Sequence, residues 1–347
     1  MQLFQKKFKS NFLIRLTHWE YWPFGIVQFP AFIYWMWCAL RERSLFFFSA
    51  SNPSIYMGGM LGESKYEVLN LVPKEVKPIT ALVKRPASKV RILEIMEQHQ
   101  LKFPVIFKPD LGERGWMVRR INHAEDIEQY LKEVRIDFLI QERLNLPLEF
   151  GVFYVRYPDE PVGRVNSITM KEFLSVTGDG KKDLRTLMLE KDRARLQWPV
   201  LQKKYAGQLN TILEAGRKME LVSIGNHCLG TKFLDGNHLI TPKLSASFDQ
   251  ISKQITGFYF GRFDLRCTSL EDLENGNIKI MELNGCGAEP AHIYHPGASL
   301  RKGIAVILKH WRDLYHISKL NHAHGVPYLS FREGYASYKK FRNLNTE

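Results

Sequence analysis

The stretch Gly257-Phe-Tyr-Phe-Gly-Arg-Phe-Asp-Leu265, followed by Ile278-Lys-Ile-Met-Glu-Leu-Asn284, decides the fold. Each run is short and rich in apolar residues, which is typical of a β-strand. Asn275-Gly-Asn277 lies between the two runs and is typical of a hairpin turn. The two runs therefore predict a pair of antiparallel strands.

Polar side chains gather at one place on this strand pair. If the connection is centred near Leu273, Asp264 lies opposite Glu282. Asn284 shares the face of Glu282, and Arg262 shares that of Asp264, because side chains alternate along a strand. Two carboxylates and an amide carbonyl are hard oxygen ligands, which suits Mg²⁺. The spacing predicts a magnesium site, and it fits equally a hairpin with ordinary polar residues on its solvent side.

A second segment places a lysine before a glycine loop. Phe103-Pro-Val-Ile-Phe-Lys108 is an apolar strand that ends in lysine, and Gly112 and Gly115 follow it. Glycines allow backbone N–H groups to approach phosphates, and a lysine supplies a positive point charge. Further along, residues 138–149 indicate two strands joined by a connector that two carboxylates bracket. Together these segments indicate a phosphate-binding site.

The order of these motifs resembles the ATP-grasp superfamily, and most closely its D-alanine–D-alanine ligase and cyanophycin synthetase members. The resemblance covers residues 63–300. It implies an α/β (α+β) fold in which two lobes clamp ATP, preceded by a short aromatic N-terminal region that the family lacks. The expected organisation is an aromatic and basic region at 1–62, a small ATP-clamping lobe at 63–150, a large lobe with the metal site at 151–300, and a C-terminal helix with an irregular basic tail at 301–347.

The resemblance also implies roles for individual residues. Lys108 would bind ATP phosphates, while Lys171 and Arg262 would be catalytic, as the second phosphate lysine and as the arginine that stabilises the acyl intermediate. Residues 141–144 would contact the adenine, and Glu149 the ribose. The implied ATP-binding set is Lys65, Lys108, Gly112, Gly115, Gln141, Glu142, Leu144, Glu149 and Lys171, and the implied ligands for Mg²⁺ or Mn²⁺ are Asp264, Glu282 and Asn284.

Two loops depart from the family pattern. The phosphate loop carries Glu113 and Arg114. A glutamate near a triphosphate is unfavourable unless the arginine or a metal offsets its charge. The run Gly285–Pro290, after the metal-site asparagine, also differs from the family sequence. Because that loop helps to form the acceptor pocket, the resemblance does not carry over a D-alanine substrate.

Three further polar residues are candidates for the acceptor side of the site. Asn226 precedes the strand pair, where related ligases place acceptor-side groups, although a simple turn also explains it. His292 and His295 follow the strand pair and are expected to face the second substrate. Either could act as a general base near neutral pH, or serve as an ordinary polar loop residue.

Composition favours anionic partners and a reducing compartment. The 347 residues carry a formal net charge of +13. Such a charge suits nucleotides, anionic lipid or acidic polymers, and nucleic acid is disfavoured because no nucleic-acid-binding motif is present. The four cysteines have no metal-binding spacing, so they predict free thiols in the cytoplasm.

The N-terminal region contains an uncharged aromatic run from Tyr21 to Leu40. Three interpretations compete: an interfacial or re-entrant membrane anchor, a buried aromatic core, and a true membrane span. Pro23 and Pro30 disfavour a span, and Trp and Tyr favour the membrane–water interface. With the flanking basic residues, the preferred location is peripheral, on the inner face of a membrane.

These observations predict an ATP-dependent ligase that joins a carboxylate to an amine through an acylphosphate and releases ADP. The aromatic N-terminal region suggests that one of the two substrates is lipidic or membrane-bound. A phosphotransferase on the same scaffold and a non-catalytic, membrane-associated nucleotide-binding protein are the alternatives. The identity of the substrates and the oligomeric state stay open.

Overall fold

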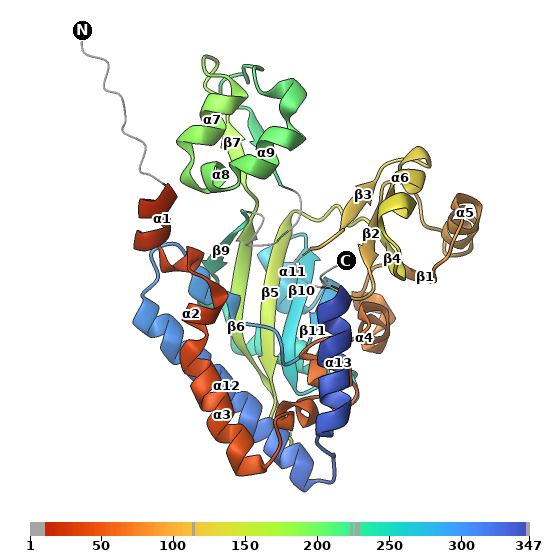
Figure 1. Ribbon diagram of the computed structural model, residues 1–347, viewed down its shortest axis with the longest axis vertical. Helices are drawn as coiled ribbons and strands as arrows, with labels where there is room; N and C mark the ends of the chain where they lie inside the picture. Colours follow the sequence, from red (N-terminus) through yellow and green to blue (C-terminus); the bar gives the residue numbers. More distant parts are fainter. Residues whose placement is uncertain (1–10, 113–114, 223–224, 226–229, 345–347) are drawn as a thin grey trace.

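The computed structural model describes residues 11–112, 115–222, 225 and 230–344. Within these residues, strands form a four-stranded sheet, a five-stranded sheet and a two-stranded ribbon, with helices packed around them. Figure 1 shows the two larger sheets side by side, with the ribbon and its helices at one end. The predicted α+β class is therefore confirmed.

The smaller sheet has the strand order β1-β4-β2-β3. All its pairings are antiparallel. Its apolar core contains three aromatic rings in mutual contact, Phe107, Tyr130 and Phe138, whose centroids are 5.2 Å apart. Its elements are β1 (Thr80–Val83), β2 (Val105–Pro109), β3 (Arg119–Ile121), β4 (Phe138–Glu142), α5 (Lys89–Gln98) and α6 (Glu125–Glu133).

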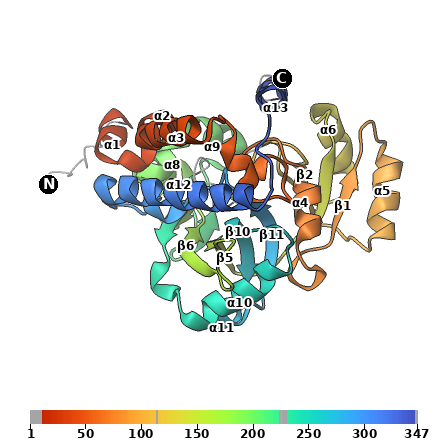
Figure 2. The ribbon, with the colours of Figure 1, turned by 90° about the horizontal axis from the view of Figure 1, so that it is seen from below.

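The larger sheet is β11-β10-β5-β6-β9, and it is also antiparallel. Helices cover both of its faces: α4, α10 and α11 lie on one side and α12 on the other (Figure 2). The sheet therefore has two apolar cores, which fixes its strands firmly. Its elements are β5 (Leu148–Val155), β6 (Arg164–Glu172), β9 (Lys232–Asp235), β10 (Phe260–Cys267), β11 (Lys279–Asn284), α4 (Lys65–Leu71), α10 (Pro242–Lys253), α11 (Leu270–Asn275) and α12 (Leu300–Ala323).

The connection between β10 and β11 differs from the predicted hairpin turn. It contains the helix α11, which Ser269 caps at its start by accepting a hydrogen bond from Asp272 N. Gly276 adopts a left-handed conformation (φ +76°) and ends the helix. A glycine in the left-handed conformation is typical of the end of a helix as well as of a hairpin turn. The Asn-Gly-Asn sequence therefore fits the end of α11 as well as the predicted turn. The predicted pairing of Asp264 with Glu282 is nevertheless confirmed.

The two-stranded ribbon carries a small helical unit at one end of the molecule (Figure 1). Leu184, Met188 and Leu201 lie in a separate apolar cluster within it. Its last α-helix, α9, ends at Lys204. The elements are β7 (Ser175–Thr177), β8 (Lys218–Glu220), α7 (Leu184–Glu190), α8 (Asp192–Leu196) and α9 (Trp198–Lys204).

The N-terminal helices lie along α12 and join the rest of the fold through specific polar contacts. They are α1 (Asn11–Thr17), α2 (Phe24–Val27) and α3 (Phe29–Glu42). Trp19 Nε1 donates a hydrogen bond to Ala298 O at 2.6 Å, and Glu42 Oε1 accepts one from the Tyr315 hydroxyl at 2.6 Å. No helix in the described ranges is both long and apolar enough to cross a bilayer.

The C-terminal tail also differs from its prediction. Residues Phe331–Leu344 form the helix α13 rather than an irregular segment. Gly334 packs directly on Phe46, since a Cβ atom at this glycine would lie 2.5 Å from the ring. The helix is therefore held by a contact with the N-terminal region, which the local sequence does not reveal.

Glycines join the N-terminal region to the loop that follows β11. Cys286 N donates to Gly58 O, and Gly287 N to Gly59 O, both at 2.9 Å. The two backbones touch, because a Cβ on Gly59 would lie 2.6 Å from Gly285 Cα. Only glycine permits so close an approach. The N-terminal region is thereby attached to the strand that carries Glu282 and Asn284.

Gly59→Ala should destabilise the protein by about 2–5 kcal/mol, combining the left-handed backbone with a steric clash. Gly62 is a matched control, because its φ of +77° resembles the +80° of Gly59 but nothing lies within 4 Å of its Cβ position. Gly62→Ala should cost only about 1–2 kcal/mol. Urea unfolding measures both values, and equal losses would refute the close backbone packing.

Candidate active site

A cavity of about 1420 Å³ lies between the two larger sheets. Lys108 and Gln141 line it from the smaller sheet. Asp264, Glu282 and Asn284 line it from the larger sheet. The structure thus brings these residues to one cavity, although Lys108 and Asn284 are 176 positions apart in the sequence.

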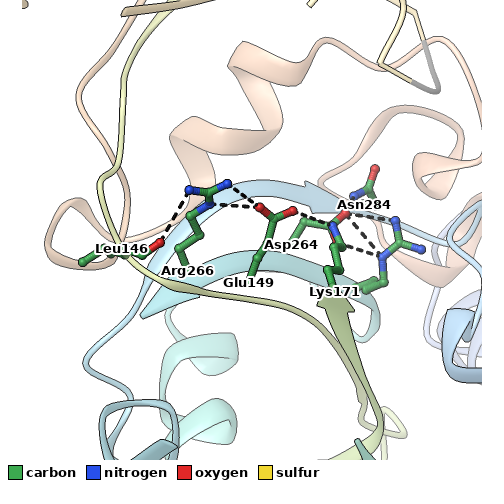
Figure 3. Close-up of polar contacts among 7 residues, drawn as sticks. Leu146, Glu149, Lys171, Asp264, Arg266 and Asn284 are labelled. Atoms are coloured by element: carbon green, nitrogen blue, oxygen red, sulfur yellow. Dashed lines mark hydrogen bonds and ion pairs between the residues drawn. The ribbon is translucent and has the colours of Figure 1, made fainter. Parts of the chain in front are cut away.

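A row of alternating charges forms the floor of this cavity (Figure 3). Arg266 contacts Glu149 at 2.8 Å, and Glu149 contacts Lys171 at 3.2 Å. Lys171 Nζ lies 3.0 Å from Asp264 Oδ1, and Arg262 Nη2 lies 2.9 Å from Asp264 Oδ2. These residues stand on neighbouring strands β5, β6 and β10, so the sheet itself sets their spacing.

Asp264 is held as a carboxylate. Burial opposes its ionisation, but the Arg262 guanidinium and the Lys171 ammonium outweigh burial and lower the pKa of Asp264 to about 2. Lys171 is likewise buried, yet Asp264 and Glu149 raise its pKa. The cavity floor therefore stays charged near neutral pH.

The predicted metal ligands converge on one side of this row. Asp264 and Glu282 face each other across β10 and β11, and Asn284 Nδ2 donates to Asp264 Oδ2 at 2.9 Å. The Asn284 amide oxygen remains as a donor atom for a cation. This donor set of two carboxylates and one amide suits Mg²⁺ chemically. Because Asp264 already contacts Lys171 and Arg262, a cation there would compete with both.

Lys108, on β2 of the smaller sheet, lines the same cavity as the row of charges. Its Nζ atom donates to Gln141 Oε1 at 3.2 Å and to Met281 O at 3.0 Å. Gln141 Nε2 also donates to Met281 O and to Thr80, so Gln141 positions the lysine and links the two sheets. Burial lowers the pKa of Lys108 to about 8.

ATP affinity should depend on pH through Lys108. Its ammonium is charged below pH 8 and neutral above it, given its pKa of about 8. Phosphates favour the charged form, so the Kd for ATP should rise above pH 8, by up to about tenfold per pH unit. Lys108→Arg keeps its charge and should flatten this dependence, and Lys108→Ala should weaken binding throughout. Calorimetric titration measures the affinities; a Kd for the wild type that stays constant through this pH range would contradict the assignment.

The remaining predicted ATP-binding residues also lie around the cavity. Lys65, Gly112, Gly115, Glu142 and Leu144 are among its lining residues. Lys65 Nζ donates to Gly112 O, which ties α4 to the glycine loop. Both oxygens of Glu149 contact cations, so the predicted ribose contact would compete with Lys171 and Arg266. Glu113 and Arg114 lie outside the described residues.

The acceptor-side predictions have a different outcome. Neither His292 nor His295 lines the cavity. His295 Nδ1 accepts from Asp235 N at 3.1 Å, and His292 is buried. This corrects the expectation that they face the second substrate and favours the polar loop alternative. Asn226 lies outside the described residues.

Sequence reasoning missed a second wall of the cavity, formed by the N-terminal region and the loop after β11. Trp22, Phe24 and Val27 line it together with Glu289 and Tyr294. Glu289 O accepts from Arg262 Nη1 at 3.1 Å, and the Glu289 carboxylate accepts from Gln28 and from Tyr294. The aromatic run was visible in the sequence, but nothing in it indicated contact with the site.

Comparison with known proteins gives similarities in structure alone. No family model matches the chain, and no curated protein matches it. Among solved structures, a D-alanine–D-alanine ligase from Bacillus anthracis matches at 12% identity and a TM-score of 0.43, over 78% of this chain and 72% of that one. The VanG D-Ala:D-Ser ligase from Enterococcus faecalis matches at 14% identity and a TM-score of 0.41, over 74% of this chain and 62% of that one.

A bifunctional glutathione synthetase from Pasteurella multocida matches at 14% identity and a TM-score of 0.36, over 71% of this chain and 36% of that one. The chain therefore spans about a third of that synthetase and less than two thirds of VanG. At such values the likeness assigns no activity, and the chemistry must follow from the side chains of this chain.

Proposed function

We propose that the chain is an ATP-dependent ligase that joins a carboxylate to an amine through an acylphosphate. One observation carries the proposal: Lys108 from the smaller sheet and a row of charges from the larger sheet, Glu149–Lys171–Asp264–Arg262, line one cavity. Cations on both sheets can hold a triphosphate between them, and carboxylates beside them can hold its metal. The similarity to ligase structures is consistent with this proposal but does not support it independently.

Each site residue has a distinct task in this reaction. Lys108 and Lys171 would hold ATP phosphates, which positions the γ-phosphorus for attack by the substrate carboxylate as ADP leaves. Asp264, Glu282 and Asn284 would hold Mg²⁺ or Mn²⁺, which neutralises phosphate charge when bound. Arg262 would face the oxyanion that forms when the amine attacks the acyl carbon and phosphate departs.

The proposal includes a peripheral position on the inner face of a membrane, where ATP is available. It rests on the exposed apolar side chains of α2 and α3, since Phe24, Phe32 and Ile33 are all more than half exposed. Monomeric soluble proteins rarely display such contiguous groups without a binding role. One substrate would then be lipidic or attached to a lipid.

Hydroxylamine trapping tests the proposed reaction. The protein is incubated with ATP, Mg²⁺, hydroxylamine and pools of carboxylates, and ADP and hydroxamate are measured. An acylphosphate intermediate is expected to give hydroxamate in step with ADP. Transfer to an alcohol instead gives ADP and a stable phosphorylated product without hydroxamate, which would favour the phosphotransferase. If calorimetry detects no ATP binding, both the ligase and the phosphotransferase are refuted.

A further inference from the structure

The outward side of α3 is apolar along its whole length. Six residues at helical spacing, here called the apolar stripe, are between 38% and 74% exposed: Phe29, Phe32, Ile33, Met36, Trp37 and Leu40. The opposite side is buried, with Ala31, Cys38 and Ala39 packed in the fold. A surface helix of a soluble protein normally has the reverse pattern on its exposed side. The apolar stripe therefore needs an apolar partner.

The charges around the apolar stripe are of one sign. In residues 11–62 the acidic side chains are Glu20 and Glu42, and both are taken up inside the fold. Glu20 forms a buried ion pair with Arg193 at 2.6 Å, and Glu42 accepts from Tyr315 and Tyr328. The basic residues Arg15, Arg41 and Arg43 are exposed. The partner is therefore expected to be anionic at its surface as well as apolar within.

The helix α13 extends this face. Figure 2 shows α2, α3 and α13 on the same side of the molecule, opposite α10 and α11. Phe331, Tyr335 and Tyr338 recur at helical spacing on α13 and are 64%, 55% and 47% exposed. The helix has one acidic residue, Glu333, against four exposed basic residues, Arg332, Lys339, Lys340 and Arg342. Aromatic side chains flanked by Lys and Arg are typical of helices that lie in a membrane interface.

The cavity reaches this face. Trp22, Phe24 and Val27 line the cavity next to Glu289 and Tyr294. Phe24 is also 54% exposed, and α2 leads directly into the apolar stripe through Gln28. Phe24 therefore belongs both to the lining of the cavity and to the exposed apolar side of α2.

We infer that α2, α3 and α13 dock on an anionic membrane, and that the second substrate is a membrane-resident amphiphile. Its reactive polar head enters the cavity past Trp22, Phe24 and Val27, while its apolar chain stays along the apolar stripe. This inference rests on the proposed function for the chemistry at the head group. A second copy of the chain could cover the stripe, but two copies would bring their basic borders together.

Vesicle flotation tests the docking surface. The full chain is mixed with vesicles of phosphatidylcholine, with and without phosphatidylserine, at low and high salt. We expect flotation with phosphatidylserine that weakens at high salt, because basic residues near anionic lipid are screened. The double substitution Phe32→Glu with Ile33→Glu should reduce the bound fraction about tenfold or more.

A matched control separates this effect from a general loss of solubility or folding. Leu270 on α11 is 50% exposed, against 56% for Phe32 and Ile33, and α11 lies on the opposite side of the molecule (Figure 2). Leu270→Glu should leave flotation unchanged. A protein that stays in solution with all vesicles, or a stripe variant that floats like the wild type, would overturn the docking surface. Dimers in solution that Phe32→Glu with Ile33→Glu converts to monomers would overturn it in favour of a second copy.

Photo-crosslinking tests the substrate class. Phosphatidylcholine with a diazirine in its acyl chain is placed in the anionic vesicles, and labelled peptides are identified by mass spectrometry. Labelling of residues 22–27 at the cavity wall, in addition to α3 and α13, is expected. Labelling confined to α3 and α13 would retain the docking surface but overturn the lateral entry of an amphiphile.

Nucleotide binding keeps the two proposals distinguishable. Phe32 and Ile33 do not line the cavity, so their double variant should bind ATP with Mg²⁺ like the wild type in calorimetry. ATP binding without any flotation or lipid labelling refutes this inference and leaves the ligase intact. Flotation and labelling without ATP binding refutes the ligase and retains only the membrane surface.

Discussion

Replacing Glu282 by glutamine is expected to reduce ATP-dependent turnover by about 10²–10³-fold. Glu282 lies opposite Asp264 on β11, and within the described residues its side chain forms no ion pair. Its loss removes one anion from the proposed metal site and breaks no ion pair of the described residues, although Glu282 is the carboxylate that most favours the charged form of buried Lys108. Stability in urea should therefore change by less than about 1 kcal/mol. ADP release and Mn²⁺ affinity, measured by electron paramagnetic resonance, should fall together.

Two further variants sharpen this test. Asp264→Asn should cause a similar loss of turnover and also destabilise the fold by about 3–5 kcal/mol, because Lys171 and Arg262 lose their shared carboxylate. Glu160→Gln is a control for charge, since Glu160 pairs with Arg164 in an exposed position. Near-normal turnover in Glu282→Gln would rule out the metal site, even if the nucleotide still binds.

Arg262→Ala is expected to slow the chemical step by about 10²–10³-fold while changing ATP affinity by less than about threefold. Arg262 donates to Asp264 and to Glu289 O, on the side of the cavity that faces Trp22 and Tyr294. It would therefore meet charge that develops at the acyl carbon rather than charge on ATP. Single-turnover rates and calorimetric affinities separate the two effects.

Arg262→Lys tests whether the geometry matters as well as the charge. A lysine keeps the positive charge but cannot contact Asp264 and Glu289 O at once through a planar fork. Most of the rate loss should remain in this variant. Arg164→Ala, at an exposed ion pair, should have no effect on either quantity. A variant of Arg262 that loses only ATP affinity would show that this arginine binds nucleotide and has no part in acyl transfer.

Local periodicity was enough to predict the strands that carry the site. Asp264 pairs with Glu282 as predicted because side chains alternate with a period of two, so a small error in the connection does not change which residues share a face. The predicted hairpin turn between these strands was wrong, because a left-handed glycine fits both a hairpin turn and the end of α11. The lysine before the glycine loop was likewise visible as an apolar strand that ends in a charge.

The sequence by itself determined the strand pair that carries Asp264, Glu282 and Asn284, the strand that ends in Lys108, and the aromatic character of the N-terminal region. Tertiary structure alone decided that this region forms a wall of the cavity, that His292 and His295 lie outside the lining of that cavity, and that α13 is a helix. The reason is the range of the interactions. Strand periodicity is set by neighbouring residues. The contacts of Gly59 with the Gly285 backbone and of Gly334 with the Phe46 ring instead join segments more than 200 residues apart, and no local pattern encodes them.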